Sequence, residues 1–363
     1  MPRPKKWSSL SDAATQITER RGLECERVHL SAIENITPRQ VTKQLVFALM
    51  RESRLMPQAD CDALEALLQG VTDVETLLLS MLREGHLTEY QASILLHGTS
   101  DGLRFDDYMA IEYLGSGGMA KVLKARDTRS GQVVALKVLS RQGLRRDLLN
   151  RFRQEVQATL SLDHPNLVKA YDFIDQPSHI LLVMEYLQGR SLEQIVQQDG
   201  VLTVEKSLHY ICQAAAGLAH AHRNGVIHRD VKPGNVHLSE TVKVLDLGLA
   251  LLPTAAERLT KVGMILGTPG YMAPEQYDDP KNVGPQADIY ALGCTMYYLL
   301  TAKPAFTGNT ALETLRAQRS NPVPRLSSHR DDIPIAVEQA CVKMLARDPS
   351  ERFATMDEVV AAF

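Results

Sequence analysis

The stretch VIHRDVKPGNVHLS, residues Val226–Ser239, places an acid, a base, an amide and an arginine within a few positions. Asp230 can orient a hydroxyl group and accept its proton, and Lys232 can neutralise negative charge beside it. Asn235 adds an amide whose oxygen is a hard ligand for Mg²⁺. These residues predict a catalytic loop. His237 stands where an apolar side chain would be more natural, which raises the question whether it impairs that loop.

Charged groups of matching chemistry lie on both sides of this stretch. Asp246, in VKVLDLGLA, follows a predicted buried strand, and with Asn235 it offers oxygen ligands suited to Mg²⁺ bound to phosphate. Lys137 lies in the apolar strand VVALKVL, where an unpaired ammonium would be costly. Glu155, in the helical LLNRFRQEVQATL, is its expected partner. An exposed lysine at a strand edge is the alternative for this segment taken alone.

A glycine-rich stretch, LGSGGMAKV, occupies Leu114–Val122 between two predicted strands. Such a hairpin exposes backbone N–H groups that can approach phosphates closely. Taken alone it is a weak signal, because most glycine-rich turns hold no ligand. Together, these groups would suffice for phosphoryl transfer, which depends mostly on positioning and electrostatic stabilisation.

The order and spacing of these motifs resemble one family. The glycine-rich loop, VALK, Glu155, HRDVKPGN, DLG and APE follow one another as in eukaryotic-like protein kinases. GGMAKV, HPNLV, GTPGYMAPEQ, DIYALG and DPSERF are similar to the bacterial Hanks-type serine/threonine group. The resemblance covers residues 105–363 and implies the α+β, bilobal protein-kinase fold. Its small β-rich lobe would span residues 105–184 and its large helical lobe residues 188–363.

The resemblance implies ATP as the phosphoryl donor, and its binding roles transfer residue by residue. The positions assigned to ATP are Leu114, Gly115, Ser116, Gly117, Gly118 and Met119 in the loop that covers the phosphates, Val122 and Ala135 above adenine, Lys137 on the α- and β-phosphates with Glu155 holding it, Met184 as gatekeeper, Glu185 and Leu187 in the hinge, and His237 as the floor beneath adenine.

Catalytic roles transfer in the same way. Asp230 matches the catalytic base, and Asn235 and Asp246 match the ligands of Mg²⁺. Lys232 and Thr268 would flank the acceptor hydroxyl, a pattern that resembles serine/threonine rather than tyrosine kinases. Structural roles fall on Asp288, which would brace the catalytic loop, and on an ion pair between Glu275 and Arg352.

Three positions depart from the family pattern. Ala120 replaces the third glycine of the loop, and a small side chain should be tolerated there. Leu247 replaces the usual phenylalanine after Asp246 and can still stack on His228. His237 replaces an apolar residue; a neutral imidazole is flat enough to stack under adenine, with a nitrogen left to find a partner. We expect His237 to weaken or retune ATP binding rather than to abolish it.

Other candidate sites are weaker. His220 and His222 are two residues apart on a predicted helix and point apart, so solvated or packed histidines are expected rather than a metal site. The cysteines form no C-x-x-C pair and are odd in number, which favours free thiols in a reducing compartment. They are Cys25, Cys61, Cys212, Cys294 and Cys341.

A helical region precedes the kinase-like part. Residues 1–36 are polar and weakly patterned, as in a disordered N-terminus. Residues 37–98 have helical periodicity, with Thr37 as N-cap and Pro38 at the first helical position. LMRESRL, Leu49–Leu55, resembles MLREGHL, Met81–Leu87, which indicates either two helical hairpins or a chance similarity of amphipathic helices. Gly and Asp residues mark a boundary near residues 99–106.

The composition and charge of the chain limit which partners and which cellular location we expect. The net charge is -3 with 23% charged residues, which gives no reason to expect nucleic acid or an anionic membrane as main partner. The longest apolar run, IYALGCTMYYLL, residues Ile289–Leu300, is too short to span a bilayer and predicts a buried helix. MPRPKKW lacks the apolar core of a secretion signal. We expect a cytoplasmic location. The closing TMDEVVAAF is helix-like, so a longer parent protein, and a membrane anchor beyond this end, stay open.

The leading hypothesis is therefore a protein serine/threonine kinase that uses ATP and Mg²⁺, phosphorylates proteins in signalling, and autophosphorylates on Thr260. A phosphate there could pair with Arg229. The alternative is a pseudokinase or nucleotide-binding scaffold, favoured by His237 and by few hydroxyls in the activation segment. In a third interpretation, the N-terminal helices carry the main function of the chain as an interaction module, which binds a partner or a second copy of the chain.

Overall fold

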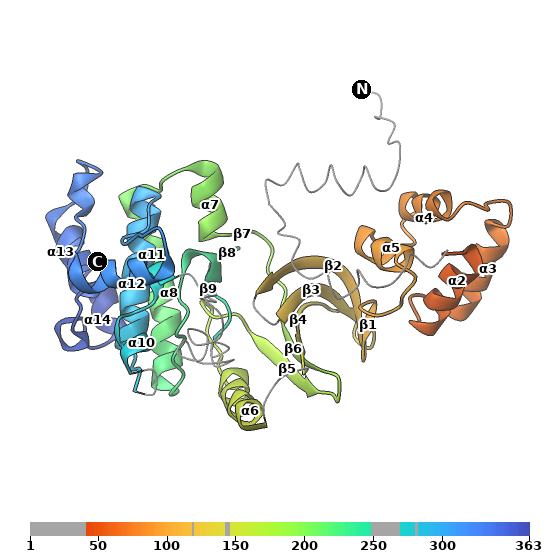
Figure 1. The fold of residues 1–363 in the computed structure, drawn as a ribbon, viewed down its shortest axis with the longest axis horizontal. Coiled ribbons are helices and arrows are strands. Elements are labelled where there is room, and N and C mark those ends of the chain that lie inside the picture. Colours follow the sequence, from red (N-terminus) through yellow and green to blue (C-terminus); the bar gives the residue numbers. More distant parts are fainter. Residues whose placement is uncertain (1–40, 118–119, 142–145, 248–268, 280–281) are drawn as a thin grey trace. The chain divides into compact units, whose positions relative to one another are not determined.

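The computed structural model describes residues 41–117, 120–141, 146–247, 269–279 and 282–363 (Figure 1). The predictions for the N-terminal 36 residues, Gly118, Met119, Thr260 and Thr268 lie outside these ranges. The chain divides into two compact units. In its described part, the first holds residues 41–117 and Lys121–Leu136, and the second holds Lys137 to the C-terminus with Ala120.

Four helices begin the first unit: α2 (Lys43–Glu52), α3 (Gln58–Leu67), α4 (Val74–Arg83) and α5 (Glu89–Leu96). Their apolar faces form a core of their own. The predicted helix start at Thr37 and Pro38 lies outside the described residues. Helix α2 begins at Lys43, because the hydroxyl of Thr42 accepts from the N–H of Leu45 and caps the helix there.

The four helices form two hairpins that repeat with an offset of 31 residues. Helices α2 and α4 begin at positions 43 and 74, and α3 and α5 begin at 58 and 89. Arg54 and Gly85, both with positive φ, occupy the same place in the two turns. The two similar heptapeptides begin at 49 and 81, so they lie one residue out of this register. Five pairs are buried in both copies: Val46/Leu77, Phe47/Leu78, Met50/Met81, Cys61/Ala92 and Leu64/Leu95.

The strands follow in the order β1-β2-β3-β4-β6-β5. They are β1 (Arg104–Phe105), β2 (Tyr108–Gly117), β3 (Ala120–Asp127), β4 (Val133–Ser140), β5 (Ala170–Asp175) and β6 (His179–Glu185). The division between the units falls within β4, after Leu136. Within the first unit, helix α5 packs against β2 (Figure 1).

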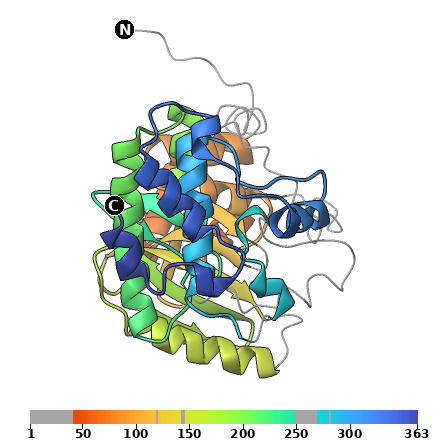
Figure 2. The same cartoon turned by 90° about the vertical axis from the view of Figure 1, so that its left-hand side faces the viewer.

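The second unit is mainly helical. Its helices are α6 (Arg146–Leu160), α7 (Leu192–Asp199), α8 (Val204–Arg223), α10 (Glu275–Asp278), α11 (Gln286–Thr301), α12 (Ala311–Ser320), α13 (Ile335–Met344) and α14 (Met356–Ala361). A small sheet orders β7 (Arg190–Ser191), β8 (Val236–Leu238) and β9 (Val242–Val244) as β7-β8-β9. Helices α8 and α11 lie side by side (Figure 2).

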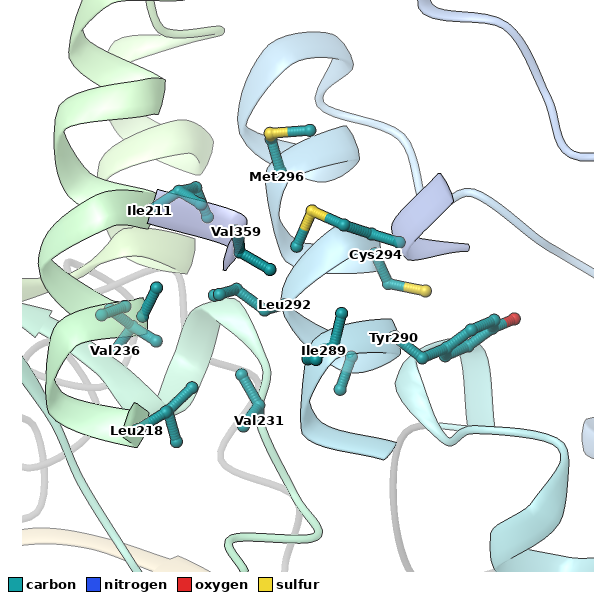
Figure 3. Close-up of a cluster of buried hydrophobic side chains, with 14 of the residues drawn as sticks. Ile211, Leu218, Val231, Val236, Ile289, Tyr290, Leu292, Cys294, Met296 and Val359 are labelled. Carbon is teal, nitrogen blue, oxygen red and sulfur yellow. The ribbon is translucent and has the colours of Figure 1, made fainter. Parts of the chain in front are cut away.

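The core of the second unit surrounds α11. Ile211 and Leu218 of α8 lie beside Leu292 of α11 and Val236 of β8 (Figure 3). Nearly every residue of α11 is buried, which confirms the buried helix predicted from its apolar run. Cys294 in α11 is fully buried, and burial raises the pKa of its thiol, so it is an inert core residue. No helix among the described residues is both long and apolar enough to cross a membrane.

Candidate active site

A buried carboxylate holds the catalytic loop in place. Asp288 of α11 accepts hydrogen bonds from the backbone N–H groups of His228 and Arg229, each at 2.8 Å. Burial alone would raise the pKa of Asp288, but the hydrogen bond from His222 and the nearby His228 lower it, so the carboxylate stays ionised. The expected bracing role of Asp288 is confirmed. Because His228 Nε2 also contacts the carbonyl of Leu245 at 2.6 Å, the loop is tied to the residue that precedes Asp246.

His222 is a functional neighbour that the sequence did not reveal. Its Nε2 lies 2.7 Å from the carboxylate of Asp288, 66 residues along the chain. The spacing of His220 and His222 argued only against a metal site. No local pattern links a helix position to a carboxylate on a distant helix, so this contact needed the tertiary structure.

Three residues of the catalytic loop meet at one carboxylate oxygen. Lys232 Nζ lies 2.9 Å from Asp230 Oδ2. Asn235 Nδ2 donates to the same oxygen at 3.0 Å and to the carbonyl of Asp230 at 2.9 Å. The described contacts use Asn235 Nδ2, so its Oδ1 is the atom free to face a cation. This geometry brings together the acid, the cation and the amide that the sequence placed in one loop.

Lys137 does not pair with Glu155, which corrects the expected ion pair. Its Nζ lies 2.7 Å from Oδ1 of Asp246, and the lysine side chain is 12% exposed. Burial would raise the pKa of Asp246, but the charge and hydrogen bond of Lys137 outweigh this effect and lower it. The buried ammonium thus has the partner it requires, but the partner is a carboxylate assigned to metal binding.

Glu155 instead faces Arg229 of the catalytic loop. Arg229 Nη1 lies 3.5 Å from Glu155 Oε1, while Glu155 Oε2 is buried with no hydrogen-bond partner among the described residues. Burial raises the pKa of Glu155 to about 7, and Arg229 offsets only part of that rise. This long, single contact is weaker than the pair between Lys137 and Asp246.

Two non-glycine residues at the site have left-handed backbone conformations. Arg229 has φ 66° and Asp246 has φ 58°. Such values are uncommon for residues with a side chain and persist only where the surroundings impose them. Here the bonds to Asp288 and Lys137 supply that constraint.

The residues assigned as gatekeeper and hinge lie where β6 leads into β7. Met184 is buried at the end of β6, and the N–H of Glu185 donates to the carbonyl of Lys169 at 2.8 Å. The hydrogen bonds between described residues include none to the backbone of Leu187, and its contact with adenine stays a prediction. Gly189 has φ 119°, and a Cβ there would lie 2.0 Å from the carbonyl of Leu238, so only glycine fits this turn.

His237 lies in β8 opposite Ser191 of β7 and Lys243 of β9. Burial lowers the pKa of its imidazole, and a hydrogen bond to the backbone of Gln188 offsets part of that effect. Its Nε2 is buried with no partner in the described part of the chain. Burial therefore favours the neutral imidazole, one nitrogen has no partner among the described residues, and the place of the ring beneath adenine stays a prediction.

The remaining positions assigned to ATP belong to the first unit. Leu114, Gly115, Ser116 and Gly117 form the end of β2, and Val122 and Ala135 lie in β3 and β4. Their roles stay predictions. The expected pair between Glu275 and Arg352 is present in the second unit, with two contacts of 2.6 and 2.9 Å and an arginine side chain that is 0% exposed.

The oxygen ligands fit a cation that arrives with a nucleotide. The described residues contain no group of three or more His, Cys, Asp and Glu side chains that could hold a metal. Asp246 and the Oδ1 of Asn235 supply one carboxylate and one amide. Mg²⁺ is commonly held by one or two carboxylates together with substrate phosphates, so this limited set is what such a site needs.

The fold and this constellation define a class of protein. The protein kinase domain family matches residues 108–362, and the chain belongs to it, within the bacterial Hanks-type serine/threonine group. A solved structure of Rad53, residues 1–466 in complex with AMP-PNP, has the same fold, with a TM-score of 0.60, 24% identity and coverage of 70% of this chain and 64% of that one. The α+β kinase fold is thereby confirmed.

The chain is similar to curated bacterial serine/threonine-protein kinases. Serine/threonine-protein kinase PknB of Mycobacterium tuberculosis is 37% identical over 266 residues, which cover 70% of this chain and 42% of that protein. Serine/threonine-protein kinase PrkC of Bacillus subtilis is 32% identical over 257 residues, which cover 70% of this chain and 39% of that protein. The chain thus spans about two fifths of the length of these relatives.

Proposed function

We propose that this chain is a protein serine/threonine kinase that transfers the γ-phosphate of ATP, with Mg²⁺, to hydroxyl groups of proteins. The observation that carries this proposal is the cluster of Asp230, Lys232 and Asn235 around one carboxylate oxygen. Its groups are those that position a hydroxyl, remove its proton and neutralise phosphate charge.

The residues of the site have separate roles in the proposed phosphoryl transfer. Asp230 is held by Lys232 and Asn235 through Oδ2, which leaves Oδ1 to accept the proton of the acceptor hydroxyl. Lys232 stays protonated beside it and faces the charge that develops on the transferred group. When bound, Mg²⁺ would be held by Asp246 and Asn235 and would neutralise phosphate oxygens.

Lys137 and Asp246 neutralise each other in this structure, although both are assigned to the nucleotide. Binding of ATP with Mg²⁺ would therefore separate the pair. Lys137 would move to the phosphates, while Asp246 would turn to the cation. Glu155 would then form an ion pair with Lys137 in place of its contact with Arg229.

A pseudokinase or nucleotide-binding scaffold is the second candidate, favoured by one observation. Glu155 contacts Arg229 rather than Lys137, and a pKa of about 7 leaves its carboxyl partly protonated at neutral pH. A chain that kept this arrangement with nucleotide bound would not align the phosphates for transfer.

The proposal includes finer roles. The chain would phosphorylate proteins in signalling and autophosphorylate on Thr260, and helices α2–α5 would bind a partner or a second copy of the chain. Residues 37–98 would form a helical extension and residues 105–363 a kinase domain, in a cytoplasmic protein.

Incubation of the purified chain with γ-labelled ATP, Mg²⁺ and a generic protein substrate tests the proposal. Label should enter serine and threonine, and chelation of Mg²⁺ should stop it. Asp230→Asn should reduce the rate by about 10²–10⁴-fold with ATP binding retained, while Asp331→Asn, a matched change at an exposed position, should have no effect. ATP binding without any transfer would instead establish the scaffold.

A further inference from the structure

We infer that Gln91 of the second helical hairpin is a positioning residue for the glycine-rich end of β2, and so sets the affinity for ATP. This inference rests on the proposed function. It concerns only the first unit, where the hairpin and the strand pack together. It gives the N-terminal helices a role inside the enzyme, beside any partner they bind.

The side chain of Gln91 joins helix α5 to strand β2 through both ends of its amide. Its Nε2 donates to the carbonyl of Ala110 at 2.7 Å, and the side chain is buried. Its Oε1 accepts from the N–H of Thr88 at 3.0 Å and completes a capping box at the start of α5. Because each end is used, the amide is fixed in one orientation.

The carbonyl of Ala110 needs this partner because the neighbouring strand is too short. Strand β1 pairs only with Tyr108 and Met109. The N–H of Ala110 donates to the carbonyl of Leu103 at 2.9 Å, but the N–H of Leu103 donates to Ser100 instead of returning the bond. Gln91 therefore supplies the missing donor of the ladder and covers an open sheet edge.

Further contacts bind the hairpins to the same region. The hydroxyl of Tyr90 donates to the carbonyl of Gly102 at 3.0 Å, and Leu103 is fully buried in the core of the four helices. The ammonium of Lys121, in β3, lies 5.0 Å from the ring centre of Phe105. Burial lowers the pKa of Lys121, and the charge of Asp101 offsets part of that. The segment after α5 is thus held to both strands that flank the glycine-rich turn.

These contacts reach the phosphate-covering residues through the strand itself. Ala110 and Gly115 are five residues apart in β2, a distance of roughly 17 Å at about 3.4 Å per residue. A strand whose edge bonds are complete frays less. Its glycine-rich end is then better ordered before nucleotide binds, so less conformational entropy is lost on binding.

The repeat provides an internal control for this contact. The residue equivalent to Gln91 in the first hairpin is Asp60 of α3, by the offset of 31 residues. Asp60 is exposed, and the structure records no contact of its side chain with a strand. A change at Asp60 perturbs the same place in a copy of the same hairpin without touching the sheet.

Gln91→Glu isolates the strand contact, because a carboxylate keeps the acceptor for Thr88 but loses the donor to Ala110. We expect the KM for ATP to rise about five- to tenfold, as for one lost buried hydrogen bond with its carbonyl left unpaired, with kcat within about twofold. Amide exchange of residues 108–117 should accelerate in parallel. Asp60→Asn, the matched control, should change neither quantity.

Two further variants distinguish the loss of the contact with Ala110 from a general loss of stability. Gln91→Met removes both hydrogen bonds without burying a charge, and should raise KM if Gln91→Glu does not fold. Thr88→Ala weakens the helix cap but leaves the donor to Ala110, so it should lower thermal stability with KM unchanged.

The outcomes separate this inference from the proposed function. An unchanged KM and unchanged exchange of residues 108–117 in both Gln91 variants would overturn the inference while wild-type turnover upheld the kinase. If the wild type transferred no phosphate, the proposed function would fail. The inference would then be decided by exchange of residues 108–117, which needs no catalysis.

Discussion

Lys137 forms a 2.7 Å ion pair with Asp246, and Glu155, the partner expected for Lys137, contacts Arg229. Two groups that would serve the nucleotide and its cation are therefore bound to each other. The arrangement satisfies a buried ammonium without a ligand. Under the proposed function, nucleotide binding would exchange one set of ion pairs for another.

Replacing Lys137 with methionine tests this exchange. Lys137→Met removes the partner of Asp246 and should raise the pKa of that carboxyl, because burial raises it and the ammonium holds it down. Phosphoryl transfer should fall by about two orders of magnitude or more. ATP should also bind more weakly, because the phosphates lose the ammonium assigned to them. Labelled-phosphate transfer measures the rate, and calorimetric titration of ATP with Mg²⁺ measures the affinity. Lys206→Met, at an exposed helix position, is the control. Unchanged ATP affinity in Lys137→Met would contradict the assignment.

Glu155 should make stability fall as pH rises. Its pKa in the folded chain is about 7, against an ordinary value of 4.5, so the folded state holds the proton more tightly than the unfolded state. This contribution is fully present below about pH 4.5 and is lost as pH rises to about 7. Glu155→Gln should flatten the dependence of the unfolding free energy on pH over this interval. Urea unfolding at several pH values measures it, and equal slopes in mutant and wild type would refute the prediction.

His237 should make ATP affinity sensitive to acid. Burial depresses the pKa of its imidazole, and adenine above it would bury the ring further, so the protonated form should bind nucleotide less well. The Kd for ATP should therefore rise as pH falls below the ordinary histidine range. His237→Leu should restore an apolar floor and remove the rise, whereas His86→Ala, at an exposed turn, should keep it. An identical pH profile for His237→Leu and wild type would show that the ring faces elsewhere.

The pair between Glu275 and Arg352 should be a major contribution to stability. Glu275→Ala leaves a fully buried guanidinium without its carboxylate and should cost about 3–5 kcal/mol of unfolding free energy. Asp357→Ala breaks the exposed pair with Arg223 and should cost about 1 kcal/mol or less. Chemical denaturation of both variants gives the comparison. Equal losses would mean that burial does not govern the pair.

Local features of the fold were predictable from sequence. The apolar run in α11 predicted a buried helix, and helical periodicity predicted α2–α5. The cap of α2 is Thr42, whose hydroxyl accepts from the backbone N–H of Leu45 in the folded chain, whereas the cap expected at Thr37 lies outside the described residues. The repeat was visible as two heptapeptides, but its register depends on where the turns place Arg54 and Gly85.

The sequence by itself determined the chemistry of the catalytic loop, because Asp230, Lys232 and Asn235 lie within six positions and a short loop can bring them together only locally. It also determined the family, through the order of its motifs. Only the tertiary structure decided which carboxylate holds Lys137, that His222 supports Asp288, and that Gln91 completes the edge of β2. Each of these is a contact between elements far apart in the chain. Its distance and degree of burial are set by how helices and strands pack, and these quantities decide which of several possible partners a charged or polar group takes.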